Sequence, residues 1–81
     1  MSFTIYSKPG CSFCEKAKDL LKSKQLEYSE VIIDVGQQKE EGKKYITVDE
    51  IRAIIPGVTS VPQIFKDGAL LGGYEALRAS L

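Results

Sequence analysis

The chain has two cysteines, Cys11 and Cys14, and they are separated by two residues. The preceding residues 3–6 (FTIY) form an apolar run typical of a strand, and the following residues 15–24 resemble a helix. At the start of a helix, free N–H groups and the helix dipole stabilise a thiolate, so we expect Cys11 to ionise readily. A thiolate attacks disulfides, and a second thiol three positions on can attack the mixed disulfide that results. The arrangement therefore predicts thiol–disulfide exchange.

Two other uses of the cysteine pair fit the sequence less well. A structural disulfide between Cys11 and Cys14 would close a very short loop, which constrains the unfolded chain little. A structural zinc site needs four ligands, whereas the chain has two cysteines and no histidine. A metal site shared between two chains, or completed by an external thiol, stays open on this reasoning.

Composition predicts a single small domain over residues 1–81. The chain is 43% hydrophobic and 27% charged, and its 11 basic residues balance its 11 acidic ones. It therefore lacks the basic field that collects nucleic acid or anionic lipid, and we expect neither partner. No apolar stretch approaches the roughly 18 residues of a membrane span. The N-terminus has no basic and apolar regions typical of a secretory signal, so the expected location is cytoplasmic.

The first half of the sequence predicts a strand, a helix and a second strand. The first strand covers residues 3–7 and the helix covers 12–24, with a break between them at Lys8-Pro9-Gly10. The other faces of the helix carry charged residues with the spacing of ion pairs, which are Glu15, Lys18, Asp19 and Lys22. The inward face of the helix is expected to carry Cys14, Ala17, Leu20 and Leu21.

The second predicted strand covers residues 28–35, and its β-branched centre favours a buried strand parallel to the first. Residues 36–45 are polar and predict a solvated loop or a frayed helical turn. The alternative for this segment is a contact surface for a protein partner.

A second helix is predicted after Thr47, because Thr47 and Glu50 have the spacing of a capping box. This helix ends before Pro56-Gly57. Its inward side chains are expected to be Ile51, Ile54 and Ile55.

The last part of the sequence predicts a hairpin and a third helix. Asp67-Gly68 favours a tight turn between strands at 63–66 and 69–71, and the helix covers 74–81. The predicted order is β-α-β-α-β-β-α. A parallel strand pair followed by a hairpin gives an α/β fold with a four-stranded mixed sheet and three helices.

Three segments, in this order, resemble the glutaredoxins and, more loosely, the wider thioredoxin superfamily. They are residues 8–14 (KPGCSFC), 60–62 (SVP) and 72–77 (GGYEAL). The likeness covers nearly the whole chain, and it implies a thioredoxin-like fold of the glutaredoxin type.

The resemblance also implies roles for residues in the first segment. Cys11 corresponds to the exposed nucleophile and Cys14 to the resolving thiol. Lys8 corresponds to the basic residue that approaches the glycine carboxylate of glutathione. Phe13 supplies the aromatic wall where many members have tyrosine.

The other two segments correspond to the remainder of a glutathione site. Pro62 corresponds to the cis-proline that faces the cysteines. The backbone of Val61 corresponds to the edge that pairs with the cysteinyl part of glutathione, as an extended peptide pairs with a strand. The γ-glutamyl end is expected at Gly73, Tyr74 and Glu75, where a Gly-Gly turn into a helix suits a carboxylate.

The chain departs from the family pattern at three further positions. Ser12 stands where many dithiol members have proline, and some members with serine there bridge an iron–sulfur cluster. Thr59 stands where many members have arginine, and Ala76 stands where others have a second acidic residue. The glutathione contacts are therefore fewer than the family norm.

The resemblance implies a glutathione-dependent oxidoreductase that reduces protein disulfides and glutathione mixed disulfides, with ribonucleotide reductase as a client that family members often serve. Glutathione is the expected reductant, no bound metal is expected, and the chain is expected to be a monomer. One alternative is a glutaredoxin-like thioredoxin reduced by a flavoprotein. The other is a dimeric carrier of a [2Fe-2S] cluster held through Cys11.

Overall fold

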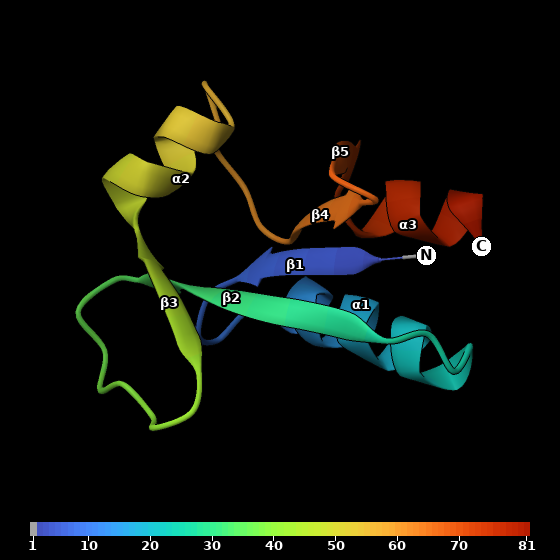
Figure 1. The fold of residues 1–81 in the computed structure, drawn as a ribbon, viewed down its shortest axis with the longest axis horizontal. Coiled ribbons are helices and arrows are strands. Elements are labelled where there is room, and N and C mark those ends of the chain that lie inside the picture. Colours follow the sequence, from blue (N-terminus) through green and yellow to red (C-terminus); the bar gives the residue numbers. More distant parts are fainter. Residues whose placement is uncertain (1) are drawn as a thin grey trace.

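The computed structural model describes residues 2–81, and Figure 1 shows how its strands and helices are arranged. No helix in this range is long and apolar enough to cross a membrane. The elements are β1 (Phe3–Ser7), α1 (Ser12–Ser23), β2 (Tyr28–Asp34), β3 (Lys44–Thr47), α2 (Val48–Ile54), β4 (Gln63–Lys66), β5 (Ala69–Gly72) and α3 (Tyr74–Ser80).

The strands form one mixed sheet in the order β3-β2-β1-β4-β5. The β1–β2 and β2–β3 pairs are parallel, whereas the β1–β4 and β4–β5 pairs are antiparallel. The predicted thioredoxin-like fold, with a mixed sheet and three helices, is confirmed. The predicted strand count was wrong, because the sheet has five strands and not four.

The strand that the sequence did not predict is β3. Its first two residues, Lys44 and Tyr45, fall in the segment 36–45 that was assigned to a polar loop. The strand has four residues and lies at the sheet edge, where it pairs with β2 from Val31↔Lys44 onward. A strand this short carries no periodic pattern of its own, and it forms because β2 offers a free edge beside it.

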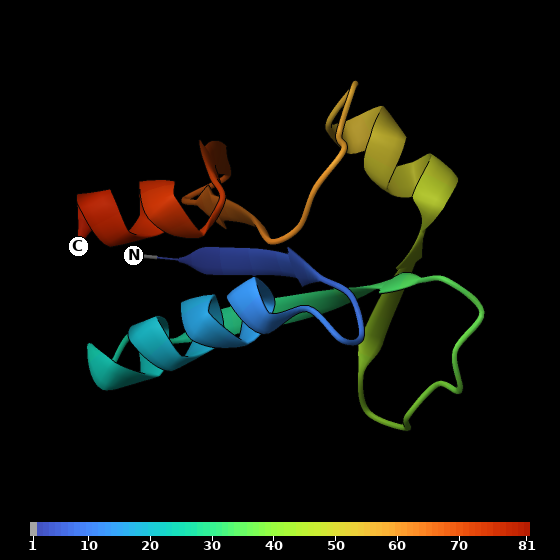
Figure 2. The same cartoon turned by 180° about the vertical axis from the view of Figure 1, so that it is seen from behind.

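The hydrophobic core lies between one face of the sheet and helices α1 and α3. Side chains along β1 alternate, so that Phe3, Ile5 and Ser7 are buried on the same face. Helices α1 and α3 contact each other across this face, which is nearer the viewer in Figure 2. The core cluster comprises Phe3, Ile5, Ala17, Leu21, Ile64 and Leu77.

Helix α2 is held at the other end of the sheet, where it contacts β2 and β3. Ile51 is buried as predicted, but Ile54 is 46% exposed, so its predicted inward position was wrong. The helix has seven residues and lies beside an edge strand, so only a small area of the sheet packs against it. For the same reason β2 is less buried than predicted, since Ile33 is its one buried residue.

Local turn and capping signals were predicted correctly. The Thr47 N–H donates to Glu50 Oε1 at 3.0 Å, and the Glu50 N–H donates to Thr47 Oγ1 at 3.1 Å, which completes the capping box. Asp67 and Gly68 adopt φ angles of 52° and 85° in the hairpin turn. These signals depend on neighbouring residues alone, which is why the sequence reveals them.

Candidate active site

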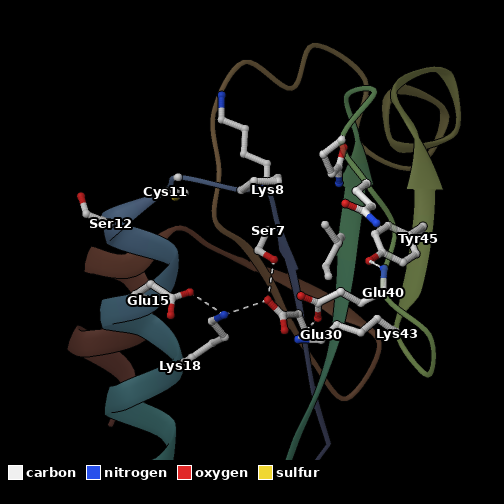
Figure 3. A pocket seen from close by; sticks show the side chains of 15 residues that line it. Ser7, Lys8, Cys11, Ser12, Glu15, Lys18, Glu30, Glu40, Lys43 and Tyr45 are labelled. Atoms are coloured by element: carbon white, nitrogen blue, oxygen red, sulfur yellow. Dashed lines mark hydrogen bonds and ion pairs between the residues drawn. The ribbon is translucent and has the colours of Figure 1, made fainter.

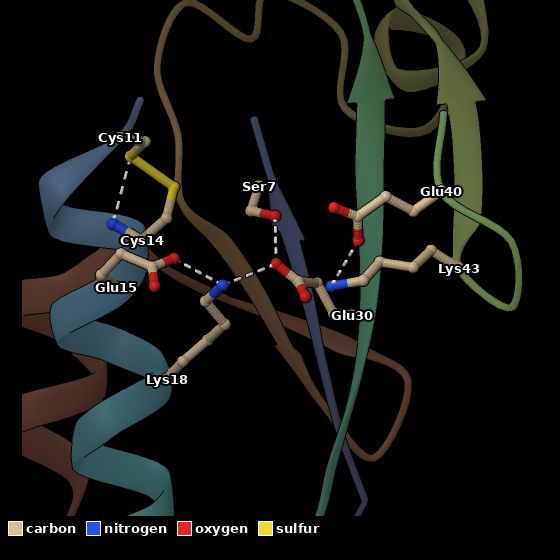
Figure 4. Close-up of polar contacts among 8 residues, drawn as sticks. All are labelled: Ser7, Cys11, Cys14, Glu15, Lys18, Glu30, Glu40 and Lys43. Atoms are coloured by element: carbon tan, nitrogen blue, oxygen red, sulfur yellow. Dashed lines mark hydrogen bonds and ion pairs between the residues drawn. A yellow bond between two sulfur atoms is a disulfide. The ribbon is translucent and has the colours of Figure 1, made fainter. Parts of the chain in front are cut away.

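Cys11 and Cys14 form a disulfide at the N-terminus of α1 (Figure 4). Cys11 is the N-cap residue, and its Sγ accepts a hydrogen bond from the Cys14 N–H at 3.1 Å. Cys11 is half-buried, whereas Cys14 is 1% exposed. The helix thus presents the more accessible sulfur to one of its own free N–H groups, which would bind a thiolate more strongly than a neutral sulfur.

The residue before the predicted cis-proline lies next to the disulfide. The Val61–Pro62 peptide bond is cis, as predicted. The distance from Cys11 Sγ to the Val61 carbonyl oxygen is 3.8 Å. Because β4 begins at Gln63, opposite Tyr6, the β1–β4 pairing holds this backbone at the same end of the sheet as Cys11.

A groove of about 290 Å³ lies on the Val61 side of the active site. The Phe13 and Tyr74 rings meet there with centroids 6.0 Å apart, and Lys16 Nζ lies 4.9 Å from the centre of the Phe13 ring. The Glu75 carboxylate is paired with Arg78 at 2.8 Å. The groove is lined by Phe13, Ser60, Val61, Pro62, Gly73, Tyr74, Glu75 and Ala76, of which Ser60 and Ala76 were not among the predicted site residues.

A second hollow, a cleft of about 450 Å³, lies on the other side of Cys11 (Figure 3). Lys8 lines this cleft together with Cys11, and it is the one predicted glutathione residue that does not line the groove. The amino group of Lys8 points away from the floor of the cleft, where Lys18 and Glu30 meet. The structure therefore brings Lys8 beside Cys11, but in a different hollow from the other predicted glutathione residues.

The floor of the cleft contains a network of charged and polar groups, which Figure 4 shows. Glu30 Oε2 accepts hydrogen bonds from Ser7 Oγ at 2.7 Å and from Lys18 Nζ at 2.9 Å. Lys18 Nζ also pairs with Glu15 Oε2 at 2.5 Å, as the spacing of these residues predicted. Ser7 is buried, and the side chains of Lys18 and Glu30 are 15% and 21% exposed.

The contacts in this network favour the charged forms of both Glu30 and Lys18. Burial alone would raise the pKa of Glu30, but hydrogen bonds from Ser7 and Lys18, with the charges of Lys18 and Lys43, lower the pKa below its usual value. Burial alone would lower the pKa of Lys18, but its bonds to Glu15 and Glu30 raise the pKa above its usual value. Glu30 and Lys18 are therefore both ionised at neutral pH.

Ser7 and Glu30 were not among the predicted site residues. One feature of the sequence could have indicated Glu30. It is a carboxylate at the start of a β-branched stretch, on a half-buried strand. A charge on the helix-facing side of such a strand needs a partner. Its partner could be found only once the sheet register and the position of α1 were known.

Comparison with known proteins identifies the family. Residues 3–71 match the family model described as glutaredoxin. The chain belongs to the glutaredoxin family. Glutaredoxin 3 of Escherichia coli K12 is 39% identical over 75 residues, which are 93% of this chain and 80% of that protein. The hybrid peroxiredoxin hyPrx5 of Haemophilus influenzae is 41% identical over 76 residues, which are 94% of this chain but 27% of that protein.

Solved structures of glutaredoxins have the same fold. Glutaredoxin 1 of Francisella tularensis, complexed with cacodylate, superposes with a TM-score of 0.72 at 30% identity, covering 98% of this chain and 90% of that one. A buckwheat glutaredoxin–glutathione complex superposes with a TM-score of 0.71 at 25% identity, covering 96% of this chain and 66% of that one. This glutaredoxin is a thiol–disulfide oxidoreductase, and Cys11 and Cys14 are its redox-active pair.

Proposed function

We propose that this glutaredoxin uses glutathione to reduce glutathione mixed disulfides and protein disulfides. The observation that carries this proposal is the groove beside Cys11, with the Val61 carbonyl 3.8 Å from Cys11 Sγ. A cysteine-containing tripeptide that pairs with the Val61 backbone has its own sulfur next to Cys11. The buckwheat glutaredoxin, a structural neighbour, is a glutathione complex, which supports the same ligand here.

The groove accommodates the γ-glutamyl half of the tripeptide. This half extends past Pro62 toward Gly73, Tyr74 and Glu75, which line the groove together. Pairing with Arg78 partly neutralises Glu75, which lessens its repulsion of the γ-glutamyl carboxylate. The glycine carboxylate lies at the opposite end, on the Lys8 side of Cys11, where an exposed ammonium group attracts it.

The chemistry proceeds through one mixed disulfide. The Cys11 thiolate attacks the glutathione sulfur of a glutathionylated protein, the protein thiolate leaves and takes a proton, and Cys11 becomes bonded to glutathione. A second glutathione thiolate attacks this bond, which yields glutathione disulfide and restores the Cys11 thiolate. When the substrate is an internal protein disulfide, Cys14 attacks the Cys11 mixed disulfide, and two glutathione molecules then reduce the Cys11–Cys14 bond.

The proposed clients are cytoplasmic proteins that cycle through a disulfide. Ribonucleotide reductase follows from the family resemblance. A peroxiredoxin is a second client, which the hybrid peroxiredoxin of Haemophilus influenzae supports, because this chain matches 27% of that protein.

Measuring which reductant supports turnover tests the proposal directly. The wild-type protein is supplied with a glutathionylated peptide and either glutathione with glutathione reductase or thioredoxin reductase, both with NADPH. We expect turnover with glutathione and none with thioredoxin reductase. Turnover with thioredoxin reductase alone would instead identify a glutaredoxin-like thioredoxin. Anaerobic treatment with iron and sulfide tests the remaining alternative, since a cluster carrier would acquire visible absorbance and form dimers.

A further inference from the structure

The network on the cleft floor joins three elements that meet below the active site. Ser7 is the last residue of β1, Glu30 lies on β2, and Lys18 lies one helical turn beyond Cys14 on α1. The single oxygen Glu30 Oε2 accepts from both Ser7 and Lys18. The active-site loop, residues 8–11, leaves β1 directly after Ser7 and enters α1 at Cys11, so the network connects the two anchors of this loop.

The positions of Val61 and Cys11, on the two sides of the active site, both depend on β1. Val61 is held against β1 by the β1–β4 pairing, in which Gln63 lies opposite Tyr6. Cys11 caps the start of α1, and α1 packs on β1 through the core cluster that Ala17 and Leu21 share with Ile5. Any sliding of α1 along the sheet therefore changes the 3.8 Å separation between Cys11 Sγ and the Val61 carbonyl oxygen.

The energetics of the Lys18–Glu30 pair also favour a positioning role. The Lys18–Glu30 pair is the least exposed of the ion pairs formed within residues 2–81. Taking two charges out of water costs about as much as their attraction returns, so such a pair is a weak source of stability. Its directional bonds fix geometry better than an apolar contact of the same size does.

We propose that Glu30 is a positioning residue for the nucleophile, because its carboxylate ties the end of β1 to α1 and thereby sets Cys11 against the Val61 backbone. Disulfide exchange requires three sulfur atoms in line, so it depends on the register between Cys11 and the backbone where the substrate docks. Alkylation of Cys11 by iodoacetamide, a small reagent that does not dock there, does not depend on this register.

The test compares these two reactions in the reduced protein. Stopped-flow rates are measured with a disulfide-bonded peptide and with iodoacetamide, both on the alkaline plateau where Cys11 is fully ionised. No glutathione is present, so the result is independent of the proposed reductant. For Glu30→Gln we expect the peptide rate to fall about tenfold, consistent with a displacement well below 1 Å, while the iodoacetamide rate changes less than about twofold.

Asp34→Asn is the matched control. Asp34 is also a carboxylate on β2 that pairs with a lysine, Lys39, at 2.8 Å, but it does not line the cleft. We expect both of its rates to match those of the wild type.

Lys18→Met provides a second variant that keeps the Ser7–Glu30 bond and the length of the side chain. We expect Lys18→Met to reproduce the loss of peptide rate. The double variant with Glu30→Gln should be no slower than the slower single variant, because both changes remove the charged Lys18–Glu30 bond. The proposal is overturned if the peptide and iodoacetamide rates fall in proportion, if neither rate changes in the variants, or if Asp34→Asn loses as much peptide rate as Glu30→Gln.

Discussion

The two sides of Cys11 are built from different kinds of groups. The groove side offers backbone edges and two aromatic rings, at Val61, Phe13 and Tyr74. The cleft side has a floor of ionised side chains, Lys18 and Glu30, around a buried hydroxyl. A backbone edge and a ring recognise a peptide without adding charge near the reacting sulfurs. The buried charges occupy the other side, where they connect the helix to the sheet, whereas the Glu75–Arg78 pair on the groove side is exposed.

We expect that removing a groove side chain reduces substrate binding, and that crowding the backbone next to the groove lowers the free energy of unfolding. Substitutions on the cleft side are expected to change geometry and acid stability. The following predictions test this division, beginning with the largest expected effect.

Gly72→Ala tests the junction between β5 and α3, which lies next to the groove residues Gly73 and Ala76. Gly72 has a φ of +132°, and a Cβ there would lie 2.8 Å from the Ala76 Cβ. We expect a loss of about 2 kcal/mol in the free energy of unfolding, because alanine is strained at this φ and contacts α3 too closely. Urea denaturation measures the loss. Gly68→Ala is the control, since a Cβ at Gly68 meets no atom within 4 Å and carries the strain of positive φ alone. An equal loss in both variants would show that the contact with Ala76 is unimportant.

Phe13→Ala tests the aromatic wall of the groove. The Phe13 side chain is 50% exposed and lies against Tyr74. Its removal is expected to raise KM for a glutathionylated peptide about tenfold, which corresponds to the loss of about 1.4 kcal/mol of aromatic contact. Leu70→Ala is the matched control, because Leu70 is 49% exposed and does not line the groove. Equal KM values for wild type and Phe13→Ala would show that the ring does not contact the substrate.

Acid unfolding tests the charges on the cleft side. Burial acts to raise the pKa of Glu30, but the hydrogen bonds from Ser7 and Lys18 outweigh burial. The net result is a pKa below the usual value of 4.5. A lowered pKa in the folded state means that the Glu30 contribution is present above pH 4.5 and is lost as the pH falls below it. We expect wild type to lose about 1 kcal/mol more than Glu30→Gln between pH 5 and pH 3. Parallel stability curves in this range would contradict an ionised, hydrogen-bonded Glu30.

The sequence was informative wherever a structural signal is local. The Thr47–Glu50 capping box, the Asp67-Gly68 turn and the break before Cys11 depend on residues a few positions apart, and the helices and strands next to them were predicted. Strand β3 and the exposure of Ile54 were missed, because both depend on which part of the sheet lies beside them.

The same distinction explains which parts of the site were predicted. Most of the predicted glutathione residues line one groove, because the resemblance carries three-dimensional information that composition and periodicity lack. The Ser7–Glu30 hydrogen bond joins residues 23 positions apart, and no local pattern marks it. Lys8 lies apart from the other predicted glutathione residues, on the cleft side of Cys11, and its contact with the glycine carboxylate stays a prediction.

The proposed mechanism depends most on the different roles of the two cysteines. The accessible Cys11 is the proposed nucleophile, and the shielded Cys14 is the proposed resolving thiol. Removal of glutathione from a protein needs only the nucleophile, because free glutathione resolves the Cys11 mixed disulfide. Reduction of an internal protein disulfide needs Cys14 as well, since its attack within the complex competes at high effective concentration.

The most direct test measures both reactions for Cys14→Ser and Cys11→Ser, with glutathione as reductant. We expect Cys14→Ser to keep deglutathionylation and to lose most reduction of protein disulfides, whereas Cys11→Ser loses both activities. Substantial activity of Cys11→Ser in either assay would contradict the assignment of the nucleophile. Equal loss of deglutathionylation in both variants would contradict the glutathione mechanism itself.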